Sequence, residues 1–232
     1  MPVEVYLEAT KKRAFAGALD WPGWCRAGRD EEAALEALIE AGPRYGRVLE
    51  GSGVRFVAPA RASTLKVVER LEGDATTDFG APSIAPSADA APIDRRWHTR
   101  NERILRACWA ALDRAVGGVR ADLEKGPRGG GRELDAIVDH VVGAEGSYLR
   151  MIAGKPPAHR EGLDAQGDAS RAAREEERSS VLEGLERALT DGIPERGPRG
   201  GARWSARYFV RRAAWHVLDH AWEIEDRSSV GR

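Results

Sequence analysis

The sequence predicts two domains: a small α+β unit at residues 1–72 and an all-α four-helix bundle at residues 94–232. Near the start, apolar residues alternate with polar ones, which is the period of a β-strand. Four later segments repeat apolar residues every three or four positions, which is the period of an amphipathic helix. The stretch between them, residues 73–93, is rich in Pro, Ala and Ser and marks the domain boundary.

The first unit combines strands with one helix. Strand-like patterns occur in four segments, which are Val3–Leu7, Arg13–Leu19, Val54–Val57 and Leu65–Val68. Trp21–Trp24 contains a Pro-Gly pair and predicts a turn. Asp30 predicts a helix start, because Asp is a good N-cap and two acidic residues follow it.

Residues 73–93 have little with which to build a core. They hold three prolines, and only Ile84 and Ile93 supply aliphatic bulk. Such a stretch buries too little apolar surface to order itself. We therefore expect either a linker or a strap that lies on the surface of a neighbouring element.

The rest of the chain is predicted to be helical. The expected helices cover residues 95–119, 133–153, 169–190 and 204–227. The second and third are joined by residues 154–168, which include Pro156 and Pro157. This connection is long for a hairpin but suits a crossover between helices that run in the same direction.

Composition excludes several functions. The 36 Lys and Arg residues balance 37 Asp and Glu residues, which argues against non-specific nucleic-acid binding. Solvated helix faces explain the many arginines more simply than a binding patch does. No apolar run approaches the roughly 20 residues of a membrane span, and the start lacks the pattern of a signal peptide, so we expect a cytoplasmic protein. Cys25 and Cys108 lie far apart and are interpreted as free thiols.

Three histidines form a candidate metal site. His216 and His220 are four residues apart in a helical segment, so their side chains lie one above the other, about 5–6 Å apart at Cβ. Glu223 continues this stripe, as a supporting partner, a fourth ligand or a general base. His140 belongs to another helix, and its apolar flanks predict that it points inward.

Three neutral imidazoles leave coordination positions open on a metal ion, as in reactive metal sites. Zn²⁺ is the expected occupant, with Ni²⁺ and Fe²⁺ as alternatives, because imidazole discriminates weakly among them. A metal in such a site lowers the pKa of a bound water or thiol and so produces a nucleophile.

The helical part resembles the DinB-like superfamily, which includes mycothiol-dependent maleylpyruvate isomerases and bacillithiol transferases. The resemblance is carried by Asp139-His140 and by the run from Trp215 to Trp222, which contains His216 and His220. It implies an up-down-down-up four-helix bundle that binds a metal through one His on the second helix and a His-x-x-x-His pair on the last. It also implies a low-molecular-weight thiol as a cofactor.

The first unit is similar to the HicB-like domain of antitoxins. The similarity rests on Trp21-Pro22-Gly23, on Gly28, and on the acidic helix start at Asp30. The charged DNA-binding module common in such antitoxins is absent from the sequence. We therefore interpret the unit as an accessory module that contacts a protein partner.

Weaker signals are interpreted mainly as structural. Two Gly-rich loops precede helices and are interpreted mainly as flexible turns. The alternative is an anion site for a cofactor or substrate, formed by the arginines of these loops, which are Arg128, Arg132, Arg199 and Arg203. His98 and His159 are expected to be surface or core residues. The aromatic residues of the last helix are expected in the core, with one or two beside the metal; they are Trp204, Tyr208, Trp215 and Trp222.

The sequence supports a metal-dependent thiol S-transferase or isomerase that acts on a small molecule. A metal-dependent hydrolase and a non-catalytic stress-response or protein-interaction module with a structural metal are the alternatives. The identity of the substrate and the formation of a homodimer stay open.

Overall fold

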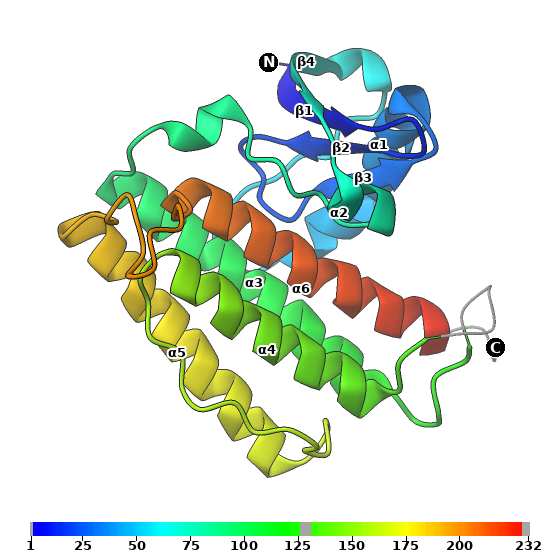
Figure 1. The fold of residues 1–232 in the computed structure, drawn as a ribbon. Helices are drawn as coiled ribbons and strands as arrows, with labels where there is room; N and C mark the ends of the chain where they lie inside the picture. The colour runs from blue at the N-terminus through cyan, green and yellow to red at the C-terminus, as the bar shows by residue number, and fades with distance from the viewer. Residues whose placement is uncertain (1, 126–130, 229–232) are drawn as a thin grey trace.

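Strands and long helices occupy different parts of the chain (Figure 1). The computed structural model describes residues 2–125 and 131–228. The strands and one helix come from the first 72 residues, and four long helices come from residue 95 onward. An α+β unit followed by a helical region is therefore confirmed.

A four-stranded sheet forms the centre of the N-terminal unit. The strands are β1 (Val3–Ala9), β2 (Ala14–Ala18), β3 (Cys25–Gly28) and β4 (Leu65–Glu72), in the order β3-β2-β1-β4. β2 is antiparallel to β1 and β3, whereas β4 is parallel to β1. The predicted strands at the positions of β1, β2 and β4 are confirmed, and β4 is longer than expected.

Helix α1 (Glu31–Leu49) packs against β2 and β3. The predicted start is confirmed, since the Asp30 side chain accepts a hydrogen bond from the Ala33 N–H at 2.9 Å. The Trp24 indole N–H donates to the Leu38 carbonyl at 2.8 Å and fixes the preceding turn to this helix. In that turn Gly23 has φ of +91°, a conformation that other residues rarely adopt.

The strand expected at Val54–Val57 is wrong, because residues 54–59 have no regular secondary structure. Phe56 instead packs into an aromatic cluster, with ring centroids 4.8 Å from Trp21, 5.1 Å from Trp24 and 5.0 Å from Tyr45. Packing of this one large, half-buried ring against three others takes precedence over the weak alternation of a four-residue segment.

Residues 73–93 form a strap, which was the second of the two expected arrangements. They include a short helix, α2 (Ala75–Phe79), and a 3₁₀ turn, η2 (Ser87–Ala90). Polar contacts order this segment in place of apolar bulk. The buried Glu8 carboxylate accepts hydrogen bonds from the Thr77 hydroxyl and the Ser83 N–H at 2.5 and 2.9 Å. The buried Asp89 forms an ion pair with Arg211.

The four long helices are α3 (Arg95–Gly118), α4 (Leu134–Met151), α5 (Asp168–Thr190) and α6 (Ala206–Ser228). Side-chain contacts relate these helices in pairs. Arg95–Glu186 and Asp113–Arg174 connect α3 with α5. Trp97–Arg207 connects the starts of α3 and α6, and Tyr148–Trp204 connects the end of α4 with the start of α6. These contacts make α5 antiparallel to α3, and α6 antiparallel to α4.

One apolar core extends from the sheet into the helices. α6 lies between the N-terminal unit and α4 (Figure 1). Its Trp215 ring contacts Phe15 of β2 edge to face at 6.2 Å. α6 is therefore buried along most of its length, which explains why His216 and His220 stand in an apolar setting.

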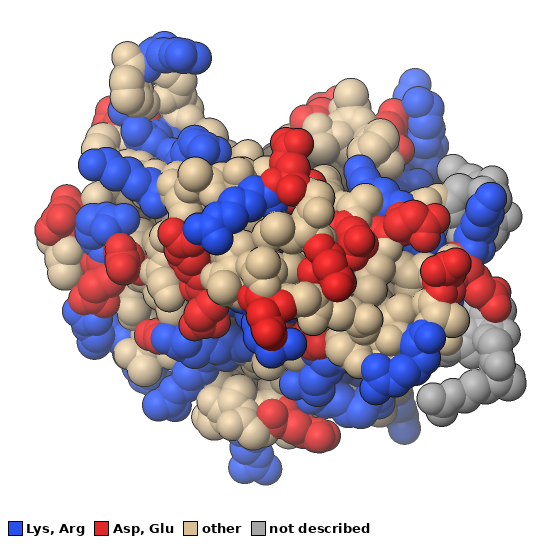
Figure 2. Space-filling view, turned by 90° about the horizontal axis from the view of Figure 1, so that it is seen from below, with Lys and Arg blue, Asp and Glu red and all other residues tan. Residues whose placement is uncertain are grey.

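One face of the molecule carries charges of both signs (Figure 2). On the face shown in Figure 2, Lys and Arg side chains are interspersed with Asp and Glu. Within residues 2–125 and 131–228, no helix combines the length and hydropathy that crossing a membrane requires.

Carboxyl groups are buried inside the bundle on α4 and on α5, at Glu145 and Glu177. Glu145 on α4 is 3% exposed and accepts a hydrogen bond from the Trp109 indole N–H at 2.6 Å. Burial raises the pKa of Glu145 from 4.5 to about 7, although the Trp109 hydrogen bond opposes this change. Glu145 is therefore largely protonated below neutral pH, and its ionisation above that range opposes folding.

Glu145→Gln is expected to stabilise the protein at pH 8 and to change its stability little at pH 5. The folded pKa exceeds the unfolded value, so folding gains a proton, and stability falls as the pH rises from about 4.5 to 7. The ionisation costs about 3 kcal/mol at pH 8. Urea unfolding at both pH values measures the change, with the exposed Glu36→Gln as control. An equal effect of Glu145→Gln at both pH values would contradict this explanation.

Candidate metal centre

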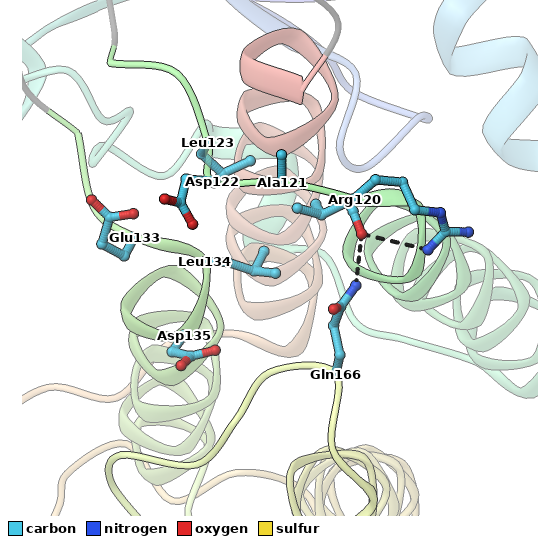
Figure 3. Close-up of a pocket in the computed structure, with 9 residues that line it drawn as sticks. Arg120, Ala121, Asp122, Leu123, Glu133, Leu134, Asp135 and Gln166 are labelled. Carbon is cyan, nitrogen blue, oxygen red and sulfur yellow. Dashed lines mark hydrogen bonds between the residues drawn. The ribbon is translucent and has the colours of Figure 1, made fainter.

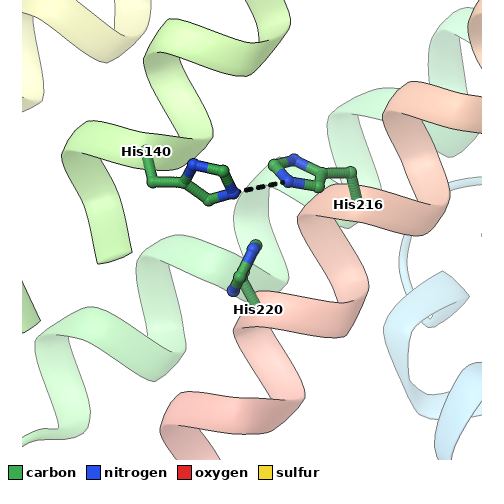
Figure 4. Close-up of side chains that lie close together, drawn as sticks. All are labelled: His140, His216 and His220. Carbon is green, nitrogen blue, oxygen red and sulfur yellow. Dashed lines mark hydrogen bonds between the residues drawn. The ribbon is translucent and has the colours of Figure 1, made fainter. Parts of the chain in front are cut away.

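Two helices bring the three predicted histidines together (Figure 4). His216 and His220 lie one turn apart on α6, and His140 faces them from α4. Ile137 and Val141, on either side of His140 along the chain, are fully buried and hold this part of α4 against its neighbours. The helical spacing of α6 and the packing of α4 on α6 therefore create the cluster.

The distances suit a single ion. One ring nitrogen from each of His140, His216 and His220 lies within 4.8 Å of the others. The Nε2 atoms of His140 and His216 are 3.1 Å apart. Two ligands at Zn–N distances of 2.0–2.1 Å in tetrahedral geometry are separated by about 3.3 Å. The closest pair already has nearly this separation.

Supporting contacts orient one of the rings. The Nδ1 atom of His220 lies 2.8 Å from the Glu223 carboxylate, whose other oxygen accepts a hydrogen bond from Arg227 at 3.0 Å. With a proton on Nδ1, the Nε2 atom of His220 carries a free lone pair. Such carboxylate–histidine pairs are the usual support of metal ligands. Arg227 is not among the residues predicted for the site, although its spacing of four residues from Glu223 is a signal for a helical ion pair.

Burial keeps the imidazoles in the form that binds metals. The side chain of His216 is 6% exposed, and desolvation lowers its pKa well below the usual value. The pKa of His140 is also lowered, first by burial and then by the proximity of His220. Both rings are therefore neutral at neutral pH and can donate a nitrogen lone pair to a metal.

The donor set fits a divalent transition metal. Three imidazoles form the protein part of an open site, and His140 is partly exposed, which leaves a route from the surface. Tyr148 borders the cluster, with its ring centroid 5.7 Å from that of His216, and Trp204 packs on Tyr148 at 5.2 Å. These rings form an apolar wall beside the histidines.

The other aromatic residues of α6 serve different neighbours. Tyr208 contacts the Trp204 ring, and its hydroxyl donates to the Ser83 carbonyl at 2.6 Å. Trp215 packs mainly on Phe15, and Arg44 lies over the Trp222 ring at 4.9 Å.

Among the described anion-binding candidates, Arg132 lies at the other end of the bundle from Arg199 and Arg203. Arg128 lies outside the described residues. Arg132 is at the start of α4, where its carbonyl accepts a hydrogen bond from Arg227. Arg203 is at the opposite end of the bundle, where it donates to the Arg150 carbonyl. Arg199, in the same loop as Arg203, is exposed.

The two remaining histidines are apart from the cluster. His98 is buried on α3, with its Nε2 atom 3.5 Å from Glu186. His159 is exposed in the connection between α4 and α5, and its Nε2 atom lies 3.0 Å from Asp139. Cys25 and Cys108 are buried free cysteines. The thiol pKa is raised by burial in both, so neither offers a ready thiolate.

A hollow of about 420 Å³ lies at the end of the bundle where α3 ends and α4 begins (Figure 3). It is bounded by residues 119–123, by the start of α4 and by Gln166, whose side-chain amide donates to the Val119 carbonyl at 3.1 Å. None of the three clustered histidines lines it. Asp135 is used structurally there, since it accepts a hydrogen bond from the Ala165 N–H.

Comparison with known proteins gives one match. The family model of the DinB superfamily matches residues 104–224. No curated protein and no solved structure matches the chain. The match begins within α3 and gives no support to the HicB-like resemblance of the N-terminal unit. Because the matched region covers more than half of the sequence and contains His140, His216 and His220, the chain belongs to the DinB superfamily.

Proposed function

We propose that this protein is a metal-dependent enzyme in which His140, His216 and His220 bind one divalent transition metal. The observation that carries this proposal is the approach of three imidazole nitrogens from two helices to within 4.8 Å. Zn²⁺ is the favoured ion, with Ni²⁺ and Fe²⁺ as alternatives.

Within this class, we propose a thiol S-transferase or isomerase that uses a small thiol of the mycothiol or bacillithiol type. A bound divalent metal supplies a lower pKa for a thiol or water in its open position. The chain itself orients His220 through Glu223 and shields one side of the site with Tyr148 and Trp204. In a transfer reaction, the thiol sulfur forms a bond to carbon while the leaving group departs with its electron pair.

Two alternatives use the same cluster. In a hydrolase, Glu223 would act as the general base, but its two oxygens already contact His220 and Arg227, which supports a positioning role instead. In a non-catalytic module, the metal would only tie α4 to α6. The partial exposure of His140 supports an accessible and therefore reactive site.

Cobalt substitution tests the proposal. Addition of a small thiol to Co²⁺-loaded protein is expected to produce a sulfur-to-cobalt absorption band in the near ultraviolet. The same addition to His216→Ala is expected to produce none. A spectrum that no thiol changes would rule out the thiol-dependent reaction, and a response to added hydroxide alone would favour the hydrolase. Thiols that bind are then assayed for S-alkylation against a panel of small electrophiles.

Two further assignments are proposals of the same kind. We propose that the bundle has the up-down-down-up order, which the pairwise directions of its helices support. We also propose that the N-terminal unit is a HicB-like accessory module that contacts a protein partner. The strand and helix content of that unit fits the second assignment.

A further inference from the structure

A second candidate site lies away from the histidines, between the first half of α3 and the loop that follows α1. This groove has a volume of about 670 Å³, within the range of pockets that hold small ligands. Its lining residues are Gly53, Val54, Arg55, Arg95, Arg96, Thr99, Arg100 and Arg103. We call it the arginine groove.

Positive charge in the arginine groove is largely uncompensated. Arg95 forms an ion pair with Glu186 at 2.6 Å. Over the part of the chain that the structure describes, Arg55, Arg96 and Arg103 have no acidic group within ion-pair distance. This local excess contrasts with the balance of the whole sequence and with the mixed charges of the face in Figure 2.

Arg100 is held at the groove mainly by neutral groups, with a weaker electrostatic attraction from the Asp20 carboxylate. Its guanidinium donates to the Asp20 carbonyl oxygen at 2.7 Å and stacks on the Trp21 ring at 4.5 Å. Stacking and a main-chain acceptor fix the direction of the side chain but leave its charge in place. Burial lowers the pKa of Arg100, a sign that the site already destabilises this cation.

Helix stability does not explain these arginines. Arg95 and Arg96 stand in the first turn of α3, where the positive end of the helix dipole repels cations. The first turn contains no acidic residue, and Asp94 serves as the N-cap through the Trp97 N–H. An anion in the groove would relieve both the mutual repulsion of the guanidinium groups and their repulsion from the dipole.

The arginine groove continues into a second, mainly apolar hollow. The two share Gly53, Val54 and Arg55, and the hollow adds Leu49, Phe56, two glycines and one acidic residue, Glu50. Gly53 has φ of +75°, which strains other residues, so no side chain at position 53 separates the two halves. The combined surface thus has a cationic end and a mainly apolar end that carries one carboxylate.

We propose that the arginine groove binds a small molecule in which a phosphate or pyrophosphate group is joined to an apolar or aromatic body. Several guanidinium groups around one space match the multiple charge and forked oxygens of phosphate. The hollow at Phe56 accommodates the uncharged body. This site is independent of the three histidines, which lie on α4 and α6.

Calorimetric titration with ADP and with pyrophosphate tests the proposal. Both are expected to bind the full-length protein at low salt, ADP more tightly, and binding is expected to weaken as ionic strength rises. Arg96→Ala and Arg103→Ala are each expected to weaken binding about tenfold. Arg171→Ala is the matched control, since it removes an exposed arginine at the start of α5 and is expected to leave affinity unchanged.

Two further variants test whether the phosphate binds in the arginine groove and whether binding needs the guanidinium shape. His216→Ala is expected to bind ADP as wild type does, which separates the groove from any phosphate bound at the metal centre. Arg103→Lys keeps the charge but loses the fork, and is expected to bind between wild type and Arg103→Ala. Without ligand, Arg96→Ala and Arg103→Ala are expected to unfold no earlier than wild type, because repulsion is reduced. The proposal is overturned if neither probe binds, if only His216→Ala loses binding, or if Arg171→Ala weakens binding as much as Arg103→Ala.

Discussion

His216→Ala is expected to lower the metal content of the purified protein from about one ion per chain to nearly none. The substitution removes one member of the closest pair, whose Nε2 atoms are 3.1 Å apart. His140 and His220 would then be the only imidazole donors, on two different helices. Loss of even a supporting partner of a ligand costs 10–100-fold in metal affinity, so loss of a ligand is expected to cost more than about 100-fold.

Elemental analysis after metal loading and desalting measures this effect. His159→Ala is the control, because it also removes one imidazole but lies outside the cluster, exposed and paired with Asp139. Circular dichroism verifies that both variants are folded. If His216→Ala retained as much metal as His159→Ala, the three histidines would not be the ligands.

The histidine cluster was only partly predictable from local sequence. A spacing of four residues places His216 and His220 on one helix face, whatever the rest of the fold is. No spacing rule relates His140 to them, because that contact depends on how α4 packs against α6. Its apolar flanks indicated only that it points inward. The family resemblance, together with the packing of α4 on α6, completes the set.

The N-terminal unit shows where short patterns fail. β3 consists of Cys25–Gly28 and has no alternation strong enough to predict a strand, yet pairing with β2 and packing of α1 order it. Val54–Val57 has a better pattern and forms no strand, because Phe56 is drawn into the aromatic cluster. In segments of four residues, tertiary contacts outweigh local preference.

The arginine groove was invisible in the sequence for a different reason. Arg55 is 40 positions from Arg95, and a count of charges does not reveal which of them have partners. From the balanced composition, all of the arginines are therefore predicted to lie on solvated helix faces. Only the arrangement in space separates the paired Arg95 from Arg96 and Arg103, which have no acidic partner among the residues that the structure describes.

Asp89→Ala is expected to lower the free energy of unfolding by about 3–5 kcal/mol. Asp89 in the strap is 2% exposed and accepts two hydrogen bonds from Arg211 of α6, at 2.7 and 2.6 Å. The variant leaves a buried guanidinium without its counter-charge, and an uncompensated buried charge is costly. For a chain of this size the midpoint of thermal unfolding should fall by about 6–20 °C, measurable by circular dichroism.

The control is Glu183→Ala, which breaks the exposed pair with Arg187 on α5 and is expected to change stability by less than about 0.5 kcal/mol. The contrast between the two variants separates burial from mere pairing. Arg211 also donates to the Ala18 and Leu19 carbonyls, so its position does not depend on Asp89 alone. A loss below about 1 kcal/mol for Asp89→Ala would therefore mean that water reaches the guanidinium. Residues 73–93 would then lie loosely on α6 instead of sealing it.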